Sequence, residues 1–190
     1  GTMDWDAFAE GHLDAAHEVL TTLRPAIEAV AAGMAERLRQ GGKVLACGNG
    51  GSAADAQHFA AELVNRFQRE RKPYAGLALT TDTSVLTSIG NDYDFSQAFS
   101  KQVEALGRKG DVLLAISTSG NAANVCRAAE AAKAAGIWTV ALCGGKGGRL
   151  VQAADVALCV GSSRITARIQ EGHAMIIHAL CELIEEQLAG

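Results

Sequence analysis

Short apolar segments that alternate with helical patterns narrow the folds open to this chain. Beyond residue 42 five such segments occur, and loops rich in glycine or hydroxyl side chains follow several of them. Short strands that are apolar on both faces and separated by helices are typical of a parallel sheet covered on both sides. The segments span residues 43–47, 76–79, 111–116, 137–142 and 155–160. We therefore expect a three-layer α/β/α fold around a central five-stranded parallel sheet.

The residues before the first strand have a helical pattern instead. Pro25 suits the first turn of a helix, so it marks the start of a second N-terminal helix that extends to about Arg39. Other helices are expected near residues 84–89, 122–135 and 166–187. Residues 1–190 are expected to form one domain, with N-terminal helices over 3–40 and an α/β core over 41–190. Residues 1–2, before Met3, are typical of an expression scar and are excluded from this reasoning.

A glycine-rich loop, Gly48-Asn49-Gly50-Gly51-Ser52, follows the first strand and opens a helix. A backbone loop of this kind favours anions, although it matches neither the Walker pattern nor G-x-G-x-x-G. In the helix that follows, His58, Glu62 and Arg66 are spaced one turn apart and are expected on one face. An anion site with acid–base groups behind it indicates chemistry on a phosphorylated small molecule. The alternative is a tight strand-to-helix turn without a ligand.

The third strand leads into a second candidate anion site, Ser117-Thr118-Ser119-Gly120-Asn121. Hydroxyl groups, backbone N–H groups and a helix dipole all favour a phosphate there, whereas ordinary helix capping needs only one such residue. Both loops leave the carboxyl ends of strands, where α/β sheets bind their ligands. Asn91-Asp92 is either a turn or a source of groups that recognise sugar hydroxyls.

The last helix carries Gln170, Glu171, His173 and His178. His173 and His178 point in different directions, so we expect them to have different roles. Spacing alone does not decide whether Gln170 or Glu171 is the neighbour of His178. The sequence around His178 predicts an apolar environment, in which an imidazole needs a partner such as a metal or a substrate hydroxyl. The apolar neighbours are Met175, Ile176, Ile177, Leu180 and Leu183.

Charge and composition exclude some classes of function. The net charge of −4 argues against nucleic acid as a partner. No apolar run reaches the roughly 18 residues of a membrane span, and no secretory signal is visible. The five cysteines lack C-x-x-C spacing and lie in apolar segments, so they are expected to be buried, reduced thiols of a cytoplasmic protein.

Several motifs together resemble the phosphoheptose isomerase family, which has the sugar isomerase (SIS) fold. They are the two loops above, His58-Phe59-Ala60-Ala61-Glu62, Leu79-Thr80-Thr81-Asp82-Thr83, Gly90-Asn91-Asp92 and Ile169-Gln170-Glu171-Gly172-His173. The resemblance covers nearly the whole chain. It implies conversion of sedoheptulose 7-phosphate to D-glycero-D-manno-heptose 7-phosphate, the first step towards nucleotide-activated heptose. It also implies a homotetramer with active sites between subunits, and N-terminal helices that serve oligomer packing.

The resemblance also implies roles for individual residues. Glu62 and His178 would carry the acid–base chemistry of a ketose–aldose isomerisation through an enediol. One zinc ion per subunit would be held by His58, Glu62, Gln170 and His178. Ala122 stands where many family members have Ser, so one hydroxyl is missing from the phosphate loop. The implied substrate-binding residues are Asn49, Gly50, Gly51, Ser52, Glu62, Arg66, Asn91, Asp92, Ser117, Thr118, Ser119 and Gln170.

Two other functions stay open at this point. A relative with the same fold is not an enzyme and binds the replication initiator DnaA. Segments such as Ala105-Leu106-Gly107 and Ala167-Arg168-Ile169-Gln170-Glu171 also resemble that protein. Another sugar-phosphate isomerase, or a sugar-phosphate sensor, is the third reading. The presence of both Glu62 and His178 favours the heptose enzyme.

Overall fold

The computed structural model describes residues 1–189 and contains one five-stranded sheet. All strand pairs are parallel, and the strand order is β2-β1-β3-β4-β5. The strands are β1 Val44–Cys47, β2 Gly76–Ala78, β3 Val112–Ile116, β4 Trp138–Gly144 and β5 Val156–Val160. This confirms the expected sheet, because every strand lies within two residues of its predicted bounds.

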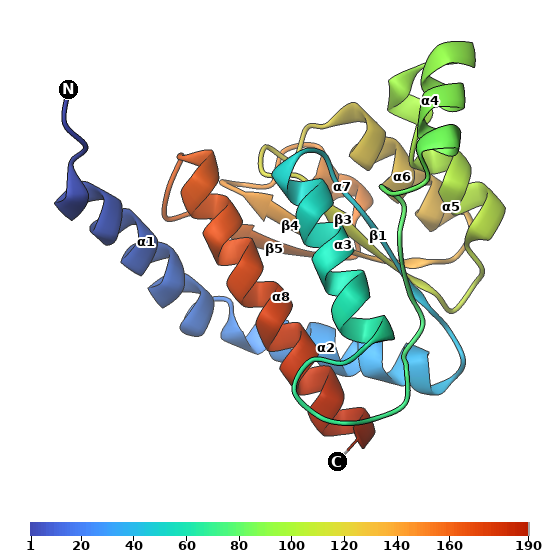
Figure 1. Cartoon of the computed structure of the whole chain (residues 1–190), viewed down its shortest axis with the longest axis horizontal. Coiled ribbons are helices and arrows are strands. Elements are labelled where there is room, and N and C mark those ends of the chain that lie inside the picture. The colour runs from blue at the N-terminus through green and yellow to red at the C-terminus, as the bar shows by residue number, and fades with distance from the viewer. Residues whose placement is uncertain (190) are drawn as a thin grey trace.

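Helices cover both faces of the sheet and complete the expected three layers (Figure 1). The predicted helices are α1 Trp5–Leu20, α2 Arg24–Arg39, α3 Gly51–Val64, α4 Thr83–Asp92, α6 Ala123–Ala134 and α8 Thr166–Ala189. One hydrophobic core cluster joins α1, α2, α3 and α8 to one face of the sheet, and a second joins α6 and the short helix α5 (Ser100–Leu106) to the other face. Three short elements have too few residues for a periodic signal: α5 Ser100–Leu106, α7 Leu150–Ala153 and the 3₁₀ turn Phe95–Gln97.

The central strand β3 packs against both layers of helices. Its five residues are all buried, and alternate side chains enter the two different core clusters. Val112, Leu114 and Ile116 pack towards α3 and α8, whereas Leu113 and Ala115 pack towards α5 and α6. Burial on both faces is what a central parallel strand requires. The loops after β1 and β3 therefore start from a fixed edge.

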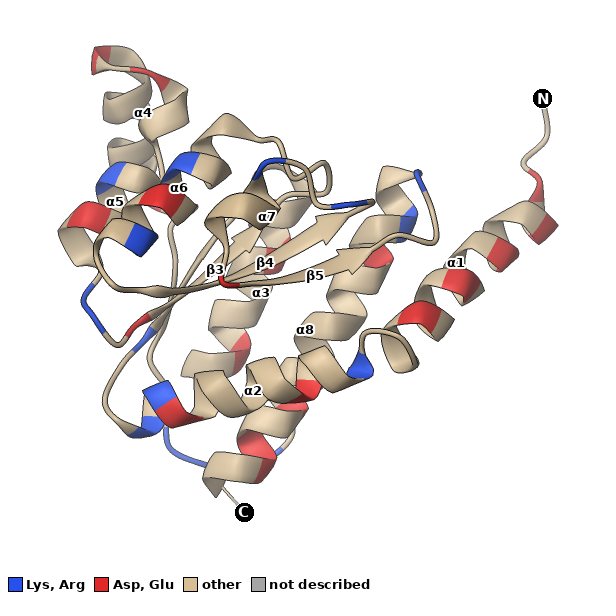
Figure 2. Ribbon diagram, turned by 180° about the vertical axis from the view of Figure 1, so that it is seen from behind, with Lys and Arg blue, Asp and Glu red and all other residues tan. Residues whose placement is uncertain are grey.

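Charged residues are distributed over several elements of the fold (Figure 2). Acidic positions recur along α1, and Lys and Arg positions are spread over several elements (Figure 2). Four cysteines are buried as expected, but Cys159 is only half-buried, so the prediction of a fully buried set is wrong for this residue. None of the helices in residues 1–189 combines the length and apolar character needed to cross a membrane.

Candidate active site

At the carboxyl edge of the sheet, a pair of amides joins the loop after β1 to the first turn of α6, the helix that follows the loop after β3. Asn49, in the loop after β1, donates to Asn124 Oδ1 over 2.8 Å, and Asn124 donates back to Asn49 Oδ1 over 2.8 Å. Asn124 lies in the first turn of α6 and is 4% exposed. Sequence reasoning missed Asn124. Its only sequence signal is its place just after the hydroxyl-rich loop.

Both loops require glycine at one position. Gly50 precedes α3 with φ 57°, and Gly120 precedes α6 with φ 69°. Residues with a Cβ rarely adopt such positive φ values. A Cβ at Gly120 would also collide with the carbonyl oxygen of Gly147. The glycines therefore fix the shape of the two candidate anion loops.

The hydroxyl groups of the second loop are used in different ways. Ser117 is buried, and its Oγ accepts from the N–H of Gly120 over 3.1 Å. Ser119 is exposed, and its Oγ accepts from the N–H of Asn121 over 3.1 Å. Ala122 stands at the N-cap of α6 without a side-chain hydrogen bond. The exposed hydroxyl of Ser119 is consequently available to a ligand, while that of Ser117 holds the loop together.

Arg149 lies beside the same loop and was not predicted. Its Nη2 donates to the carbonyl oxygen of Asn121 over 3.0 Å, and its backbone N–H donates to Asn121 Oδ1 over 3.0 Å. The glycine-rich segment 144–148 returns the chain to this loop, since a Cβ at Gly148 would lie 2.6 Å from Asn121 Oδ1. Arg149 thus places a guanidinium close to the position where Ala122 supplies no hydroxyl.

Helices α3 and α8 pack side by side (Figure 1). We call their contact surface the α3–α8 seam, and it carries the side chains of His58, Glu62 and His178. Potential ligand atoms of His58, Glu62 and His178 all lie within 4.8 Å of one another. His58 Nε2 is 4.0 Å from Glu62 Oε2, and the two imidazole rings meet edge to face with centroids 5.1 Å apart. Two imidazoles and one carboxylate form a possible metal-binding site.

Gln170 and Glu171 separate clearly in space. A Cβ at Gly51 would lie only 2.5 Å from Gln170 Nε2, so the Gln170 amide packs on the first residue of α3. Glu171 instead pairs with Arg168 over 2.7 Å and with His12 over 3.3 Å. The structure therefore places Gln170, and not Glu171, on the α3–α8 seam. Gln170 and His178 are about two helical turns apart in the sequence. A metal ion bound by both side chains therefore stays a prediction.

The environment predicted for His178 is wrong. His178 is exposed, whereas Ile176, Ile177 and Leu180 are buried. The apolar neighbours in sequence point into the core because they occupy the other face of α8. His173 does have a different role, as expected: it is fully buried, and its Nε2 lies 2.8 Å from the carbonyl oxygen of Cys143. Burial lowers the pKa of His173, which keeps its ring neutral.

Arg66 does not share the helical face of His58 and Glu62. The helix ends at Val64, because Asn65 leaves helical geometry with φ −88° and ψ −89°. Arg66 is exposed and pairs with Glu70 over 3.7 Å. The prediction that His58, Glu62 and Arg66 share one face of this helix is therefore wrong for Arg66.

The remaining predicted residues lie near α3 or on α4. Ser52 is buried in the first turn of α3. Asn91 and Asp92 end α4 and are exposed, with Asn91 Nδ2 donating to Asp92 Oδ1 over 2.8 Å. They are helical and not a turn between helices. In Figure 1 α4 stands away from the α3–α8 seam, so this chain alone does not bring them to the His58 group.

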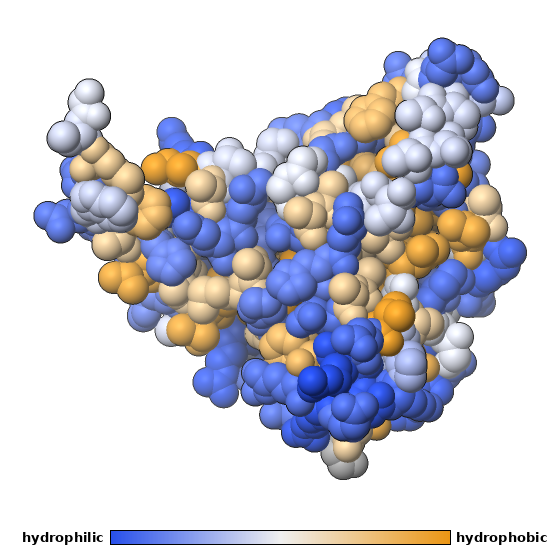
Figure 3. All heavy atoms as spheres, viewed as in Figure 1, coloured by the Kyte–Doolittle hydropathy of each residue, from blue (hydrophilic) through white to orange (hydrophobic). Residues whose placement is uncertain are grey.

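The molecular surface is concave along one edge (Figure 3). Figure 3 shows a hollowed upper edge between the projecting ends α1 and α4. Asp55, one turn before His58, also lies on α3. Burial raises the pKa of the Asp55 carboxyl, and the charge of His58 opposes that rise. Sequence reasoning did not single out Asp55.

Comparisons with known proteins identify the family of this chain. Residues 7–144 match the SIS domain family. The chain is 54% identical to a phosphoheptose isomerase of Thiobacillus denitrificans over 189 residues, which cover 98% of this chain and 93% of the relative.

Solved structures give the same result. The structure of a phosphoheptose isomerase from Neisseria gonorrhoeae has a TM-score of 0.87 at 50% identity and covers 95% of this chain and 96% of that chain. A phosphoheptose isomerase from Francisella tularensis has a TM-score of 0.91 at 43% identity, with the same coverage of both chains. These relatives favour the isomerase over the DnaA-binding alternative. The chain belongs to the phosphoheptose isomerase family of SIS-domain enzymes.

Proposed function

We propose that this enzyme converts sedoheptulose 7-phosphate to D-glycero-D-manno-heptose 7-phosphate, the first step towards nucleotide-activated heptose. The observation that carries the proposal is that His58, Glu62 and His178 meet on the α3–α8 seam, and that α3 begins at the first of the two candidate anion loops. Ketose–aldose isomerisation moves a proton between neighbouring carbons through an enediol, so it needs a base at carbon and an acid at oxygen. Glu62 takes the carbon-bound proton, and His178 exchanges the proton at oxygen.

The loops supply the phosphate and hydroxyl contacts in this proposal. Ser119 offers an exposed hydroxyl, and Asn49 offers an amide held in place by Asn124. Arg149 adds a positive charge beside Asn121. The other contacts proposed for the sugar phosphate come from Gly50, Gly51, Ser52, Arg66, Asn91, Asp92, Ser117, Thr118 and Gln170.

A zinc ion fits the donor set on the α3–α8 seam. The 4.0 Å between His58 Nε2 and Glu62 Oε2 exceeds hydrogen-bond range, and ligand atoms of one tetrahedral zinc lie on the order of 3–4 Å apart. His58, Glu62, His178 and Gln170 would hold it, one ion per subunit. When bound, zinc supplies a Lewis acid that polarises the sugar carbonyl and hydroxyl. Glu62 and His178 would still move the protons.

Replacing the proposed base tests the reaction. Glu62→Gln keeps the shape of the side chain but cannot accept a proton, so we expect kcat to fall by about 10³-fold. The assay follows sedoheptulose 7-phosphate by NMR. Glu104→Gln, an exposed position on α5, is the matched control and should keep full activity. Normal turnover by Glu62→Gln would remove Glu62 from the base role.

Metal removal tests the zinc proposal separately. Protein purified without a histidine tag should contain one zinc per chain by elemental analysis, and chelation should abolish activity until zinc is added back. Low pH should release the metal, because an imidazole must be neutral to bind it. Full activity in metal-free protein would contradict the zinc role and leave the Glu62 and His178 roles standing.

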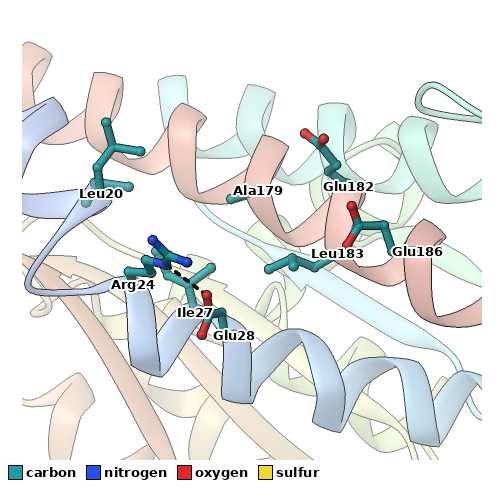
Figure 4. Close-up of a pocket in the computed structure, with 9 residues that line it drawn as sticks. Leu20, Arg24, Ile27, Glu28, Ala179, Glu182, Leu183 and Glu186 are labelled. Atoms are coloured by element: carbon teal, nitrogen blue, oxygen red, sulfur yellow. Dashed lines mark hydrogen bonds and ion pairs between the residues drawn. The ribbon is translucent and has the colours of Figure 1, made fainter.

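We also propose a homotetramer with active sites between subunits. The support is exposed apolar surface on α1: Trp5 is 70% exposed, Leu13 64% and Leu20 60%. Leu20, Ile27 and Leu183 line a groove between α1, α2 and α8, on which a second copy of this chain would pack (Figure 4). Light scattering should give four times the 19.7 kDa chain mass, and Leu20→Glu should lower it. A wild-type monomer would refute the tetramer.

We propose a cytoplasmic location as well, and cell fractionation tests it.

A further inference from the structure

A buried ion pair lies on the α3–α8 seam beyond the His58 group. Arg71 Nε donates to Glu185 Oε2 over 2.9 Å, and the two side chains are only 4% and 2% exposed. Arg71 comes from the loop between α3 and β2, and Glu185 comes from α8. Glu185 follows His178 by two helical turns, so both project from the same side of α8. We call this pair the Arg71–Glu185 clamp.

Arg71 binds the end of the helix that carries Glu62. Its Nη2 donates to the backbone carbonyl of Glu62 over 2.6 Å, and its Nη1 donates to the carbonyl of Leu63 over 2.7 Å. The last carbonyl groups of a helix lack partners within the helix, and a cation there also suits the helix dipole. Arg71 is consequently attached directly to the backbone of the proposed catalytic base.

Glu185 fixes the loop that follows the same helix. Its carboxylate accepts the backbone N–H groups of Phe67, Gln68 and Arg69 over 3.0, 2.8 and 2.9 Å. This places the Phe67 ring 5.7 Å from the His178 ring, with 33° between their planes. One carboxylate on α8 therefore controls both the backbone of Glu62, through Arg71, and the ring that flanks His178.

A buried ion pair is weak evidence for stability, because removing two charges from water offsets much of their attraction. The pair also joins α8 to the end of α3, and acid–base catalysis depends on how the reacting groups are placed. A misplacement of about 1 Å at reacting groups can cost about 10²-fold in rate. We propose that Arg71 and Glu185 are positioning residues of the isomerase, which set the spacing of Glu62 and His178 across the α3–α8 seam. The proposal rests on the acid–base roles given above for these two residues.

The test compares two buried carboxylates that have similar hydrogen bonds. Glu185→Gln removes the charge of the clamp at nearly constant size. Asp111→Asn does the same at the starts of β1 and β3, where Asp111 pairs with Lys43 over 2.7 Å. For each variant we would measure kcat, KM, zinc content and the midpoint of thermal unfolding.

We expect both variants to unfold at lower temperature than the wild type. Only Glu185→Gln should lower kcat, by about 10²-fold, with KM changed less than threefold. Arg71→Lys keeps the charge but loses the forked donor geometry, and it should lower kcat in the same direction. Equal kcat values for Glu185→Gln and Asp111→Asn at equal loss of unfolding temperature would overturn the positioning role.

A measurement without turnover keeps the outcome separate from that of the proposed reaction. Nuclear Overhauser contacts between the rings of Phe67 and His178 should be present in the wild type and lost in Glu185→Gln, with Asp111→Asn unchanged. Phe67→Leu should leave the Arg71 contacts intact and lower kcat less than Glu185→Gln does. Persistence of the ring contact in folded Glu185→Gln would refute the clamp, even if the wild type had no activity on sedoheptulose 7-phosphate.

Discussion

Glu185 and Asp111 are both buried carboxylates that accept hydrogen bonds from backbone N–H groups and from a basic side chain. Asp111 accepts the N–H groups of Lys43 and Arg108 over 3.0 and 2.8 Å and the Nζ of Lys43 over 2.7 Å. It joins the starts of β1 and β3, which are already neighbours in the sheet. Glu185 joins α8 to a loop and, through Arg71, to the end of α3.

The difference lies in what else fixes the connected elements. Strands β1 and β3 are held in register by a ladder of backbone hydrogen bonds, so Asp111 reinforces an arrangement that other bonds determine. Two packed helices have no shared ladder, and side chains alone set their relative position. Glu185 therefore has more control over geometry than Asp111, although their hydrogen bonds are similar. Through Arg71 this control reaches Glu62, and through Phe67 it reaches His178.

The largest expected effect concerns acid stability at Glu185. Burial by itself raises the pKa of this carboxyl, but hydrogen bonds from Gln68, Phe67, Arg69 and Arg71 outweigh it and lower the pKa from 4.5 to about 2. A lowered pKa stabilises the folded state above the unfolded pKa, and this contribution disappears as pH falls from 4.5 towards 2. The shift corresponds to about 3 kcal/mol.

Urea unfolding across this pH range measures that contribution. The wild type should lose unfolding free energy between pH 4.5 and 2, and Glu185→Gln should lose about 3 kcal/mol less over the same interval. Glu186→Gln, at the exposed neighbouring position, is the control and should follow the wild type. Parallel curves for Glu185→Gln and the wild type would mean that the carboxylate gains nothing from its donors.

A smaller effect is expected where amides, and not charges, join the loop after β1 to the first turn of α6. Asn124→Ala removes the partner of Asn49 and should raise KM for sedoheptulose 7-phosphate by about 5- to 10-fold, as one hydrogen bond is worth about 1 kcal/mol. Because Asn124 acts through Asn49, the double variant should match Asn49→Ala alone. Additive increases in KM would show that Asn124 has a separate role.

Local sequence features predicted most of the fold. Strands and long helices are visible as apolar runs and periodic patterns. Pro25 lies in the first turn of α2 and marks the start of this helix. The pairing of Glu185 with Arg71 has no local signal, because 114 positions separate the two residues. His58 and His178 were identified by residue type, but their edge-to-face contact depends on how α3 packs on α8.

The errors also have physical reasons. Arg66 continues the spacing of His58 and Glu62, but spacing does not reveal where a helix ends. His178 has apolar neighbours in sequence, yet these occupy the buried face of α8 and leave the imidazole exposed. Residues on α4 were predicted for the site from resemblance, and one chain does not bring Asn91 and Asp92 to the seam.

The smallest effect tests burial without hydrogen-bond donors, the opposite of the situation at Glu185. Burial raises the pKa of the Cys47 thiol to about 12, and burial with the nearby charges of Glu62 and Glu185 raises that of Cys181 to about 12. Thiolate is the reactive form, so neither should react in the folded protein at neutral pH. Iodoacetamide should label the half-buried Cys159 first, as followed by peptide mass spectrometry. Urea should bring Cys47 and Cys181 to the rate of Cys159, and early labelling of either one without urea would contradict their burial.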